Sequence, residues 1–139
     1  MDITRGGQFL VKETESASVF TPEDFSSEQK LMRDTVSEFV DKEIWPHKLR
    51  FEQRDFALTE SCMRKAAELG FLSIAVPEAY GGLGMGFVDT CLVCDYISGA
   101  TGSFSTAFGA HTGIGTMPIL LYGTEEQKQS NIHIQFHPP

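Results

Sequence analysis

Basic residues are scarce in this sequence. Its 139 residues include 11 Lys and Arg against 19 Asp and Glu, which gives a formal net charge of -8. A nucleic-acid-binding surface needs a basic face that neutralises phosphates, so the charge balance argues against such a partner. The length fits a single domain.

The sequence also lacks a secretory leader and a paired set of cysteines. Residues 1–8 are polar and contain no apolar core of the kind that a signal peptide requires. Three cysteines cannot form a complete disulfide framework. We therefore expect a cytoplasmic protein with free thiols.

Charged side chains are missing from residues 96–124. A helix without a charged face either is buried all round in a large protein or spans a membrane. Glycine, serine and threonine interrupt this segment, which favours burial and predicts no transmembrane helix. Gly109 and Gly113 are four residues apart, and each costs about 1 kcal/mol relative to alanine in a helix. Their presence predicts that another helix or a ligand approaches closely there.

Two residue pairs raise the question of metal or redox chemistry. Cys91 and Cys94 form a Cys-x-x-Cys, which is typical of a redox pair or of half a zinc site. They lie in an apolar helical run over residues 88–97 with no second cysteine pair, so we interpret them as buried, inert thiols. His133 and His137 have His-x-x-x-His spacing, but Pro138 argues against the helix that such a pair needs. We expect no metal site.

Residues 69–86 form an apolar stretch that ends in closely spaced glycines. Gly70 is expected to end a helix in the left-handed conformation, and Pro77 favours an extended residue before it. A phosphate-binding loop and a packed turn both use such glycines. The spacing Gly82-x-Gly84-x-Gly86 differs from the dinucleotide fingerprint, and no strand–helix–strand unit surrounds it. The packed turn is therefore the favoured interpretation.

The apolar periodicity predicts an all-α fold of about five to six helices. Ser26 with Gln29 and Thr124 with Gln127 read as capping boxes, and Thr59 reads as an N-cap. The helices are expected over residues 27–53 with an interruption at Pro46, 60–69, 88–98, 103–115, 117–122, and onward from residue 125. We divide the chain into a mobile arm (residues 1–20), a helical domain (21–129), and a tail (130–139) with strand-like alternation.

Several motifs resemble one known family. The run Val76-Pro77-Glu78-x-Tyr80-Gly81-Gly82-x-Gly84 is similar to the Pro-Glu-x-Tyr-Gly-Gly-x-Gly run in the N-terminal helical domain of acyl-CoA dehydrogenases. Gly109-Ala110-His111-x-x-Ile114-Gly115 resembles the long- and very-long-chain branch. Ser27-Glu28-Gln29-Lys30 and Leu120-Leu121-Tyr122-Gly123-Thr124-Glu125-Glu126-Gln127-Lys128 also resemble the family, in the right order. The resemblance covers about residues 20–129.

The resemblance implies an FAD-dependent oxidation of the Cα–Cβ bond of a fatty acyl-CoA. In the family, the catalytic glutamate and most flavin contacts lie in a middle β-domain and a C-terminal helical bundle, which this sequence lacks. No catalytic residue is assigned, the cofactor-binding residues are unknown, and Glu78 is interpreted as a turn-edge carboxylate. The residues that the resemblance places along the acyl channel are Thr106, Ala107, Ala110, His111 and Ile114. His111 is also open to a second interpretation, a neutral histidine hydrogen-bonded between helices.

The family pattern stops at about Gln129, which suggests a truncation, a changed reading frame or an artificial junction. We expect the isolated chain to be inactive and to self-associate through apolar helical surface. Two further interpretations stay open. One is a non-catalytic helical module that binds a protein or an acyl ligand, and the other is a small metal-binding redox protein built on Cys91, Cys94 and the tail histidines.

Overall fold

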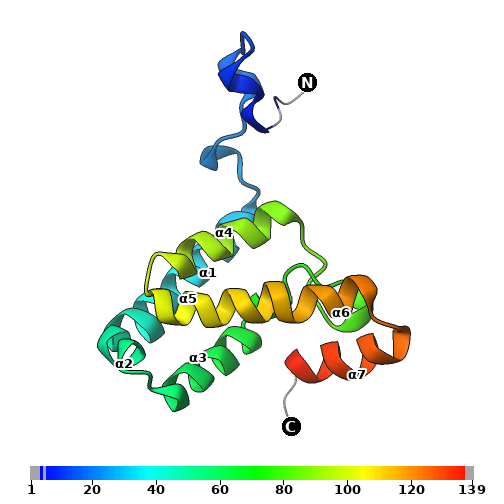
Figure 1. Ribbon diagram of the computed structural model, residues 1–139. Coiled ribbons are helices and arrows are strands. Elements are labelled where there is room, and N and C mark those ends of the chain that lie inside the picture. The colour runs from blue at the N-terminus through cyan, green and yellow to red at the C-terminus, as the bar shows by residue number, and fades with distance from the viewer. Residues whose placement is uncertain (1–3, 5, 137–139) are drawn as a thin grey trace. The chain divides into compact units, whose positions relative to one another are not determined.

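The computed structural model describes residue 4 and residues 6–136. The chain divides into two compact units, one ending at Leu31 and one beginning at Met32. Every regular element of the described residues is helical (Figure 1), which confirms the all-α prediction. The first unit contains short 3₁₀ turns at Gly6–Leu10, Ser16–Ser18 and Pro22–Asp24, together with the beginning of the first long helix.

The α-helices are joined by short connections, except for one longer segment over residues 69–86. They are α1 (Ser27–Phe39), α2 (Lys48–Glu52), α3 (Phe56–Glu68), α4 (Phe87–Ser98), α5 (Gly102–Gly109), α6 (Met117–Tyr122) and α7 (Glu125–Phe136). Two π-helical segments, Val40–Ile44 and Ala110–Thr116, continue α1 and join α5 to α6. Single 3₁₀ turns lie at Trp45–His47, Phe71–Ser73 and Glu78–Tyr80.

The beginning of α1 and its interruption are as predicted. The Ser26 amide donates to Oε1 of Gln29 at 3.0 Å, and the Gln29 amide donates to Oγ of Ser26 at 3.1 Å. Further along, the helix widens to π geometry and then tightens to the 3₁₀ turn that contains Pro46. Proline has no amide donor and its ring crowds the preceding turn, so the regular α-helical ladder cannot pass through it.

The prediction that Thr59 caps α3 is wrong. The helix begins at Phe56, and the Asp55 carboxylate accepts the Leu58 amide at 3.0 Å. This bond and the nearby Arg50 guanidinium hold the pKa of Asp55 below its usual value. Thr59 instead donates its hydroxyl to the Asp55 carbonyl at 3.0 Å. The apolar pattern concealed this first turn, because Phe56 is exposed to solvent.

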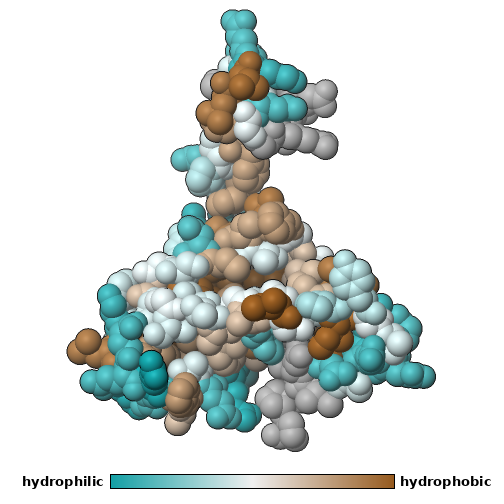
Figure 2. All heavy atoms as spheres, in the orientation of Figure 1, coloured by the Kyte–Doolittle hydropathy of each residue, from teal (hydrophilic) through white to brown (hydrophobic). Residues whose placement is uncertain are grey.

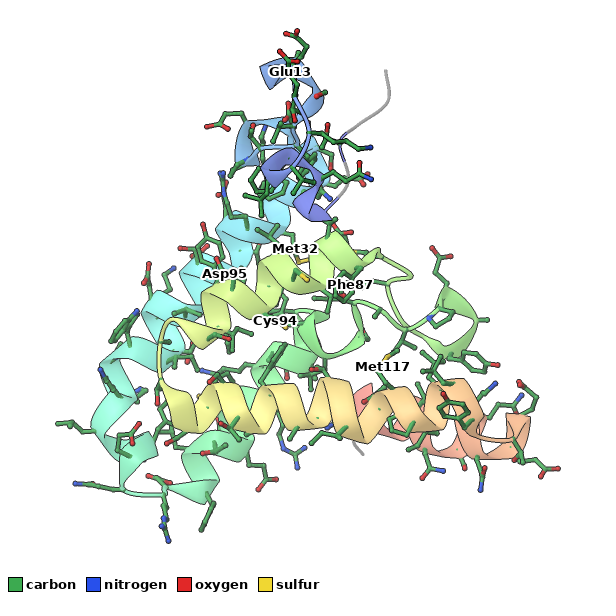
Figure 3. The ribbon with its side chains drawn as sticks, turned by 45° about the horizontal axis from the view of Figure 1, so that its top comes forward. Glu13, Met32, Phe87, Cys94, Asp95 and Met117 are labelled. Carbon is green, nitrogen blue, oxygen red and sulfur yellow. The ribbon has the colours of Figure 1, made fainter. Side chains whose placement is uncertain are left out.

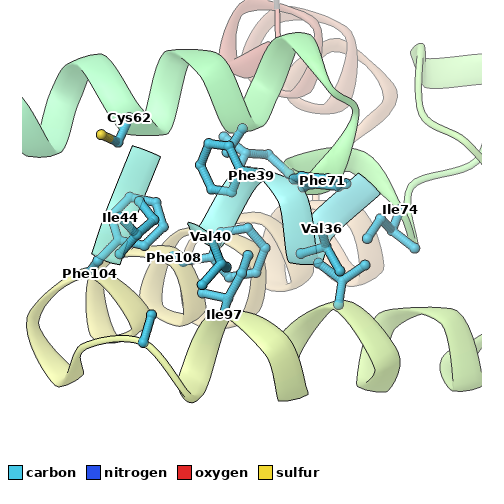
Figure 4. Packing of buried hydrophobic residues seen from close by; sticks show 14 of the residues in the cluster. Val36, Phe39, Val40, Ile44, Cys62, Phe71, Ile74, Ile97, Phe104 and Phe108 are labelled. Atoms are coloured by element: carbon cyan, nitrogen blue, oxygen red, sulfur yellow. The ribbon is translucent and has the colours of Figure 1, made fainter. Parts of the chain in front are cut away.

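The core of the second unit is built from aromatic and branched side chains (Figure 4). The ring centroid of Phe39 lies 5.7 Å from that of Phe71 and 6.1 Å from that of Phe104. The ring centroids of Phe104 and Phe51 are 5.6 Å apart. Offset or edge-on contacts at these centroid distances are favourable for aromatic pairs. The cluster therefore ties the end of α1 to α2, to the connection after α3, and to α5.

The uncharged segment forms one long run of α5, π-helical turn and α6, drawn from yellow to orange in Figure 1. Phe104, Phe108 and Thr116 are buried beneath it. Gly109, Ala110, Gly113 and Ile114 are exposed, so the prediction that the segment is buried all round is wrong for this chain. One face packs on the core, and the other faces solvent without a charged side chain.

The prediction of strand-like structure after residue 129 is also wrong, because α7 continues to Phe136. The helix begins with the predicted capping box: the Thr124 amide donates to Gln127 Oε1 at 2.9 Å, and the Gln127 amide donates to Thr124 Oγ1 at 3.3 Å. Ile132 is fully buried in the core cluster and anchors the helix. His137 and Pro138 lie outside the described residues.

Candidate functional site

The glycine stretch after α3 is a packed turn. Gly70, Gly81 and Gly84 all have positive φ, at 80°, 82° and 61°, which is the conformation that glycine adopts without penalty. Gly82 is needed for a different reason, because a Cβ at this position would lie 2.0 Å from the Val76 carbonyl oxygen. The turn therefore folds back directly onto the backbone of the preceding apolar segment.

The amides of this turn are already used within the protein. The amides of Leu83, Gly84 and Met85 donate to the carbonyls of Ser73, Val76 and Ile74, at 2.8–3.0 Å. The Gly86 amide donates to the buried Asp89 carboxylate at 3.0 Å, which caps α4. A phosphate cradle needs such amides to point at the ligand. The arrangement confirms the packed turn.

A side-chain cluster connects the turn to α7. The Tyr80 hydroxyl donates to Oε2 of Glu125 at 2.7 Å, and the Lys128 ammonium donates to Oε1 of the same carboxylate at 3.0 Å. The ammonium nitrogen also lies 5.8 Å from the centre of the Tyr80 ring. The Tyr80 hydrogen bond, with help from Lys128, holds the pKa of Glu125 below its usual value. We call these three residues the Tyr80 cluster.

Behind the turn, an apolar cavity of about 400 Å³ lies between the 71–76 segment, α4 and the α5–α6 run. In Figure 3, Phe87 and Cys94 from α4 and Met117 from α6 lie on the facing sides of these helices. Phe108, Gly109 and Gly113 contribute from the α5–α6 run. None of the described residues that line the cavity is charged.

The polar groups of the cavity wall are satisfied locally. The hydroxyls of Thr90, Thr112 and Thr116 donate to the carbonyls of Gly86, Phe108 and His111, at 3.3, 2.9 and 2.8 Å. Bonds of this kind leave the hydroxyl donors turned toward the helix backbone. The cavity therefore presents an apolar interior.

The three cysteines differ in environment. Cys62 is buried, Cys94 is half-buried at the cavity, and Cys91 is exposed. The interpretation of both Cys91 and Cys94 as buried thiols is therefore wrong for Cys91. Burial raises the pKa of the Cys94 and Cys62 thiols. Higher thiol pKa means less thiolate at neutral pH, which is the reactive form.

The five residues that the family resemblance places along an acyl channel lie on the other side of the same run. Thr106, Ala110 and Ile114 are exposed, and Ala107 and His111 are half-buried. None of the five lines the cavity. We call this exposed side the outer face. In Figure 2 the surface over α5 and α6 is mostly pale or brown, with little of the deep teal of charged residues.

His111 is the polar member of that set. Its Nε2 atom is buried and has no hydrogen-bond partner among the described residues. Burial lowers the pKa of its imidazole, so the ring is neutral at pH 7. Buried polar atoms are normally paired, and the described part of the chain supplies no partner helix group for the predicted interhelical hydrogen bond.

Sequence reasoning missed the cavity residues Phe87, Thr90, Cys94 and Phe108. The glycines pointed toward the site without locating it. A Cβ on Gly109 or Gly113 would meet nothing within 4 Å, so no helix of the described chain approaches them. Both glycines line the cavity instead. The predicted close approach of a helix to these glycines is therefore not found within the described chain.

The described residues offer neither a metal centre nor a membrane-spanning helix. In the described part of the chain, no three His, Cys, Asp or Glu side chains converge on a point where they could hold a metal ion. The side chain of His133 and all of His137 lie outside what the structure describes. None of the described helices combines the length and apolarity needed to cross a bilayer.

Comparison with known proteins gives a consistent result. The sequence model of the family "Acyl-CoA dehydrogenase, N-terminal domain" matches residues 26–133. A probable acyl-CoA dehydrogenase of Bacillus subtilis (strain 168) is 40% identical over 128 residues, covering 92% of this chain and 21% of that protein. The mitochondrial isovaleryl-CoA dehydrogenase of Solanum tuberosum is 34% identical over 106 residues, covering 76% of this chain and 26% of that protein.

Among solved structures, the acyl-CoA dehydrogenase of Bacillus anthracis complexed with FAD superposes with a TM-score of 0.83 at 42% identity. The match covers 95% of this chain and 22% of that one. The chain thus spans about a fifth to a quarter of the length of the relatives it matches.

Proposed function

The chain belongs to the acyl-CoA dehydrogenase family as its N-terminal helical domain, and we propose that its outer face forms one wall of the acyl channel in an FAD-dependent enzyme. The reaction of such an enzyme removes a proton from the α-carbon and a hydride from the β-carbon of a fatty acyl-CoA. FAD supplies the redox chemistry by accepting the hydride. The role proposed for this domain is to bind and orient the hydrocarbon part of the substrate.

The absence of charge on the outer face is the observation that carries this proposal. Residues 96–124 contain no Asp, Glu, Lys or Arg, yet Ala110 and Ile114 are exposed, and Ile114 as a residue is 78% exposed to solvent. An exposed apolar surface of this kind is typical of a ligand or protein interface. The hydrocarbon part of an acyl chain offers no polar group, so it suits a wall without charges.

The described residues do not suit the flavin phosphates. The glycine turn is the glycine-rich loop of the chain, and its amides are bonded to carbonyls of the 73–76 segment or to Asp89. A dinucleotide pyrophosphate would need free amides or basic side chains. We therefore infer that FAD is held by protein outside these residues.

The test is the acyl-chain preference of a full-length enzyme that carries this domain. Ala110→Leu should shift the kcat/KM profile toward shorter acyl-CoA substrates, because a larger side chain would fill the channel wall. Ala57→Leu is the matched control, since Ala57 is exposed on α3 away from the α5–α6 run. An unchanged profile in Ala110→Leu would contradict the proposed wall.

The exposed outer face also favours a second candidate, a non-catalytic module that binds a protein or an acyl ligand. The two candidates differ in whether the purified protein contains flavin. Purified full-length protein with a flavin absorption band supports the dehydrogenase. Colourless protein that co-purifies in fixed proportion with a lipid supports the module.

A further inference from the structure

The cavity between α4 and the α5–α6 run has the dimensions of a small-molecule site. Its volume of about 400 Å³ falls in the range of about 300–1,000 Å³ typical of ligand pockets. Phe87 and Cys94 both line it, and they are two helical turns apart, so the cavity extends for about 10 Å along α4. Phe108 and Met117 mark a similar length on the opposite wall.

The chemistry of the wall restricts what the cavity can hold. The described lining residues carry no charge, and the three threonine hydroxyls donate to backbone carbonyls of their own helices. A charged or strongly polar ligand would lose its hydration without gaining partners, which is costly. An elongated apolar space with satisfied walls suits a linear hydrocarbon.

Gly109 and Gly113 add room to one side of this space. A Cβ at either position would meet no atom within 4 Å, so the packing of the described chain does not require glycine there. Glycine nevertheless weakens a helix relative to alanine. The two positions are exposed and line the cavity, which places its opening along this part of the run.

We propose that this cavity binds an unbranched hydrocarbon chain at a site separate from the outer face. The site lies on the side of the run that carries Phe108, Thr112 and Thr116, whereas the proposed channel residues Ala110 and Ile114 lie on the exposed side. The proposal goes beyond the dehydrogenase role, since it depends only on the cavity and is tested on the chain itself without substrate or flavin.

Two thiols on α4 provide the measurement. Cys94 lines the cavity, while Cys91, one helical turn away, is exposed. The full chain is treated with N-ethylmaleimide in the presence of n-alkanols from butanol to dodecanol, and the rate at each cysteine is followed by tandem mass spectrometry. A bound alkanol should slow alkylation of Cys94 about tenfold at ten times its Kd and leave the Cys91 rate unchanged.

The dependence on chain length gives a second signature. Each added CH₂ should tighten the protection of Cys94 about threefold to fourfold, until the chain fills the cavity and the gain stops. General denaturation by the alcohol predicts the opposite pattern. It would expose the buried Cys62 and accelerate its alkylation, with no limiting chain length.

Matched glycine variants test the location. Gly113→Leu places a side chain in the cavity and should abolish the protection of Cys94. Gly102→Leu is the control, because a Cβ there also meets nothing within 4 Å but the residue does not line the cavity. Circular dichroism establishes that each variant is folded. If Gly113→Leu does not fold, the chain-length series on the unaltered chain decides alone.

The proposal is overturned if no alkanol in the series slows Cys94 relative to Cys91, or if protection continues unchanged in folded Gly113→Leu. Either result would mean that the cavity does not bind a hydrocarbon chain.

Discussion

At the scale of single residues, two glycines with opposite surroundings allow a direct comparison. Gly82→Ala should destabilise the chain by about 3 kcal/mol or more, because the new Cβ would overlap the Val76 carbonyl. Gly113→Ala should stabilise it by about 0.5–1 kcal/mol, because the new methyl has open space and alanine favours helix. Urea unfolding of both variants measures the difference. Equal effects would contradict the packed turn.

His111 predicts a specific pH dependence. Burial lowers its pKa, so on acidification the unfolded chain takes up the proton before the folded one does. The free energy of unfolding should therefore fall as the pH drops below about 6.5, the ordinary histidine value. His111→Gln should remove this loss, and His47→Gln should retain it. NMR titration of the His111 ring provides an independent check, and a titration at or above the ordinary value would refute the prediction.

Sequence reasoning placed five channel residues on the α5–α6 run and did not identify the cavity on the other side of the same run. The five predicted channel residues and the cavity residues alternate along the run from Thr106 to Met117. A helical periodicity of 3.6 assigns faces correctly only where the helix is regular. Here Ala110–Thr116 is π-helical, and the wider turn shifts the direction of each following side chain. Single-residue assignments beyond that point need coordinates.

At the scale of elements, the Tyr80 cluster links the glycine turn to α7. Tyr80→Phe should speed amide hydrogen exchange in α7, since the hydroxyl that fixes Glu125 is lost. Tyr122→Phe is the matched control, because Tyr122 is 87% exposed. The stabilisation of α7 by the Glu125 carboxylate should be complete above the ordinary glutamate pKa of about 4.3. It should be lost as the pH falls through the lowered pKa that Glu125 has in the folded chain. Equal rates of amide exchange in α7 for the two variants would contradict a stabilising role of the Tyr80 hydroxyl.

Helix boundaries were predicted correctly where a capping box coincided with the start of a periodic apolar pattern. Ser26 and Thr124 were identified because each is followed three residues later by a glutamine that completes a capping box. The beginning of α3 was missed because Asp55 and Thr59 are both good caps. The periodic apolar pattern also begins only after the first turn of the helix. The helical tail was missed because the alternation around Ile132 resembles a strand. The capping box, the buried Ile132 and the Tyr80 cluster all hold this segment as a helix.

At the scale of the whole molecule, the exposed apolar residues of the α5–α6 run should drive self-association. Ile114, Leu121 and Tyr122 are 78%, 60% and 87% exposed, and the net charge of -8 opposes contact through acidic surfaces. Sedimentation should show dimers or larger species, favoured by salt that screens the repulsion. Ile114→Asp should reduce association, and Leu49→Asp, also highly exposed but on α2, should not. A monomer at all concentrations would contradict the prediction.

The fold class followed from composition and periodicity, because amphipathic stripes and caps are local features. The exposed outer face did not follow, since burial depends on what else surrounds the helix. Phe104 and Ile114 lie in the same uncharged run, and only packing separates the buried residue from the exposed one. Sequence alone cannot tell a helix covered by its own chain from one covered by another part of a larger protein.

The scarcity of basic residues also determines where trypsin can cleave this protein. Trypsin cleaves after Lys and Arg, and the sequence contains neither between Lys65 and Lys128. The glycine turn, α4, α5 and α6 therefore lie together in one large tryptic peptide. Peptide maps of the cavity call for pepsin or chymotrypsin, whose apolar and aromatic cleavage sites are abundant there.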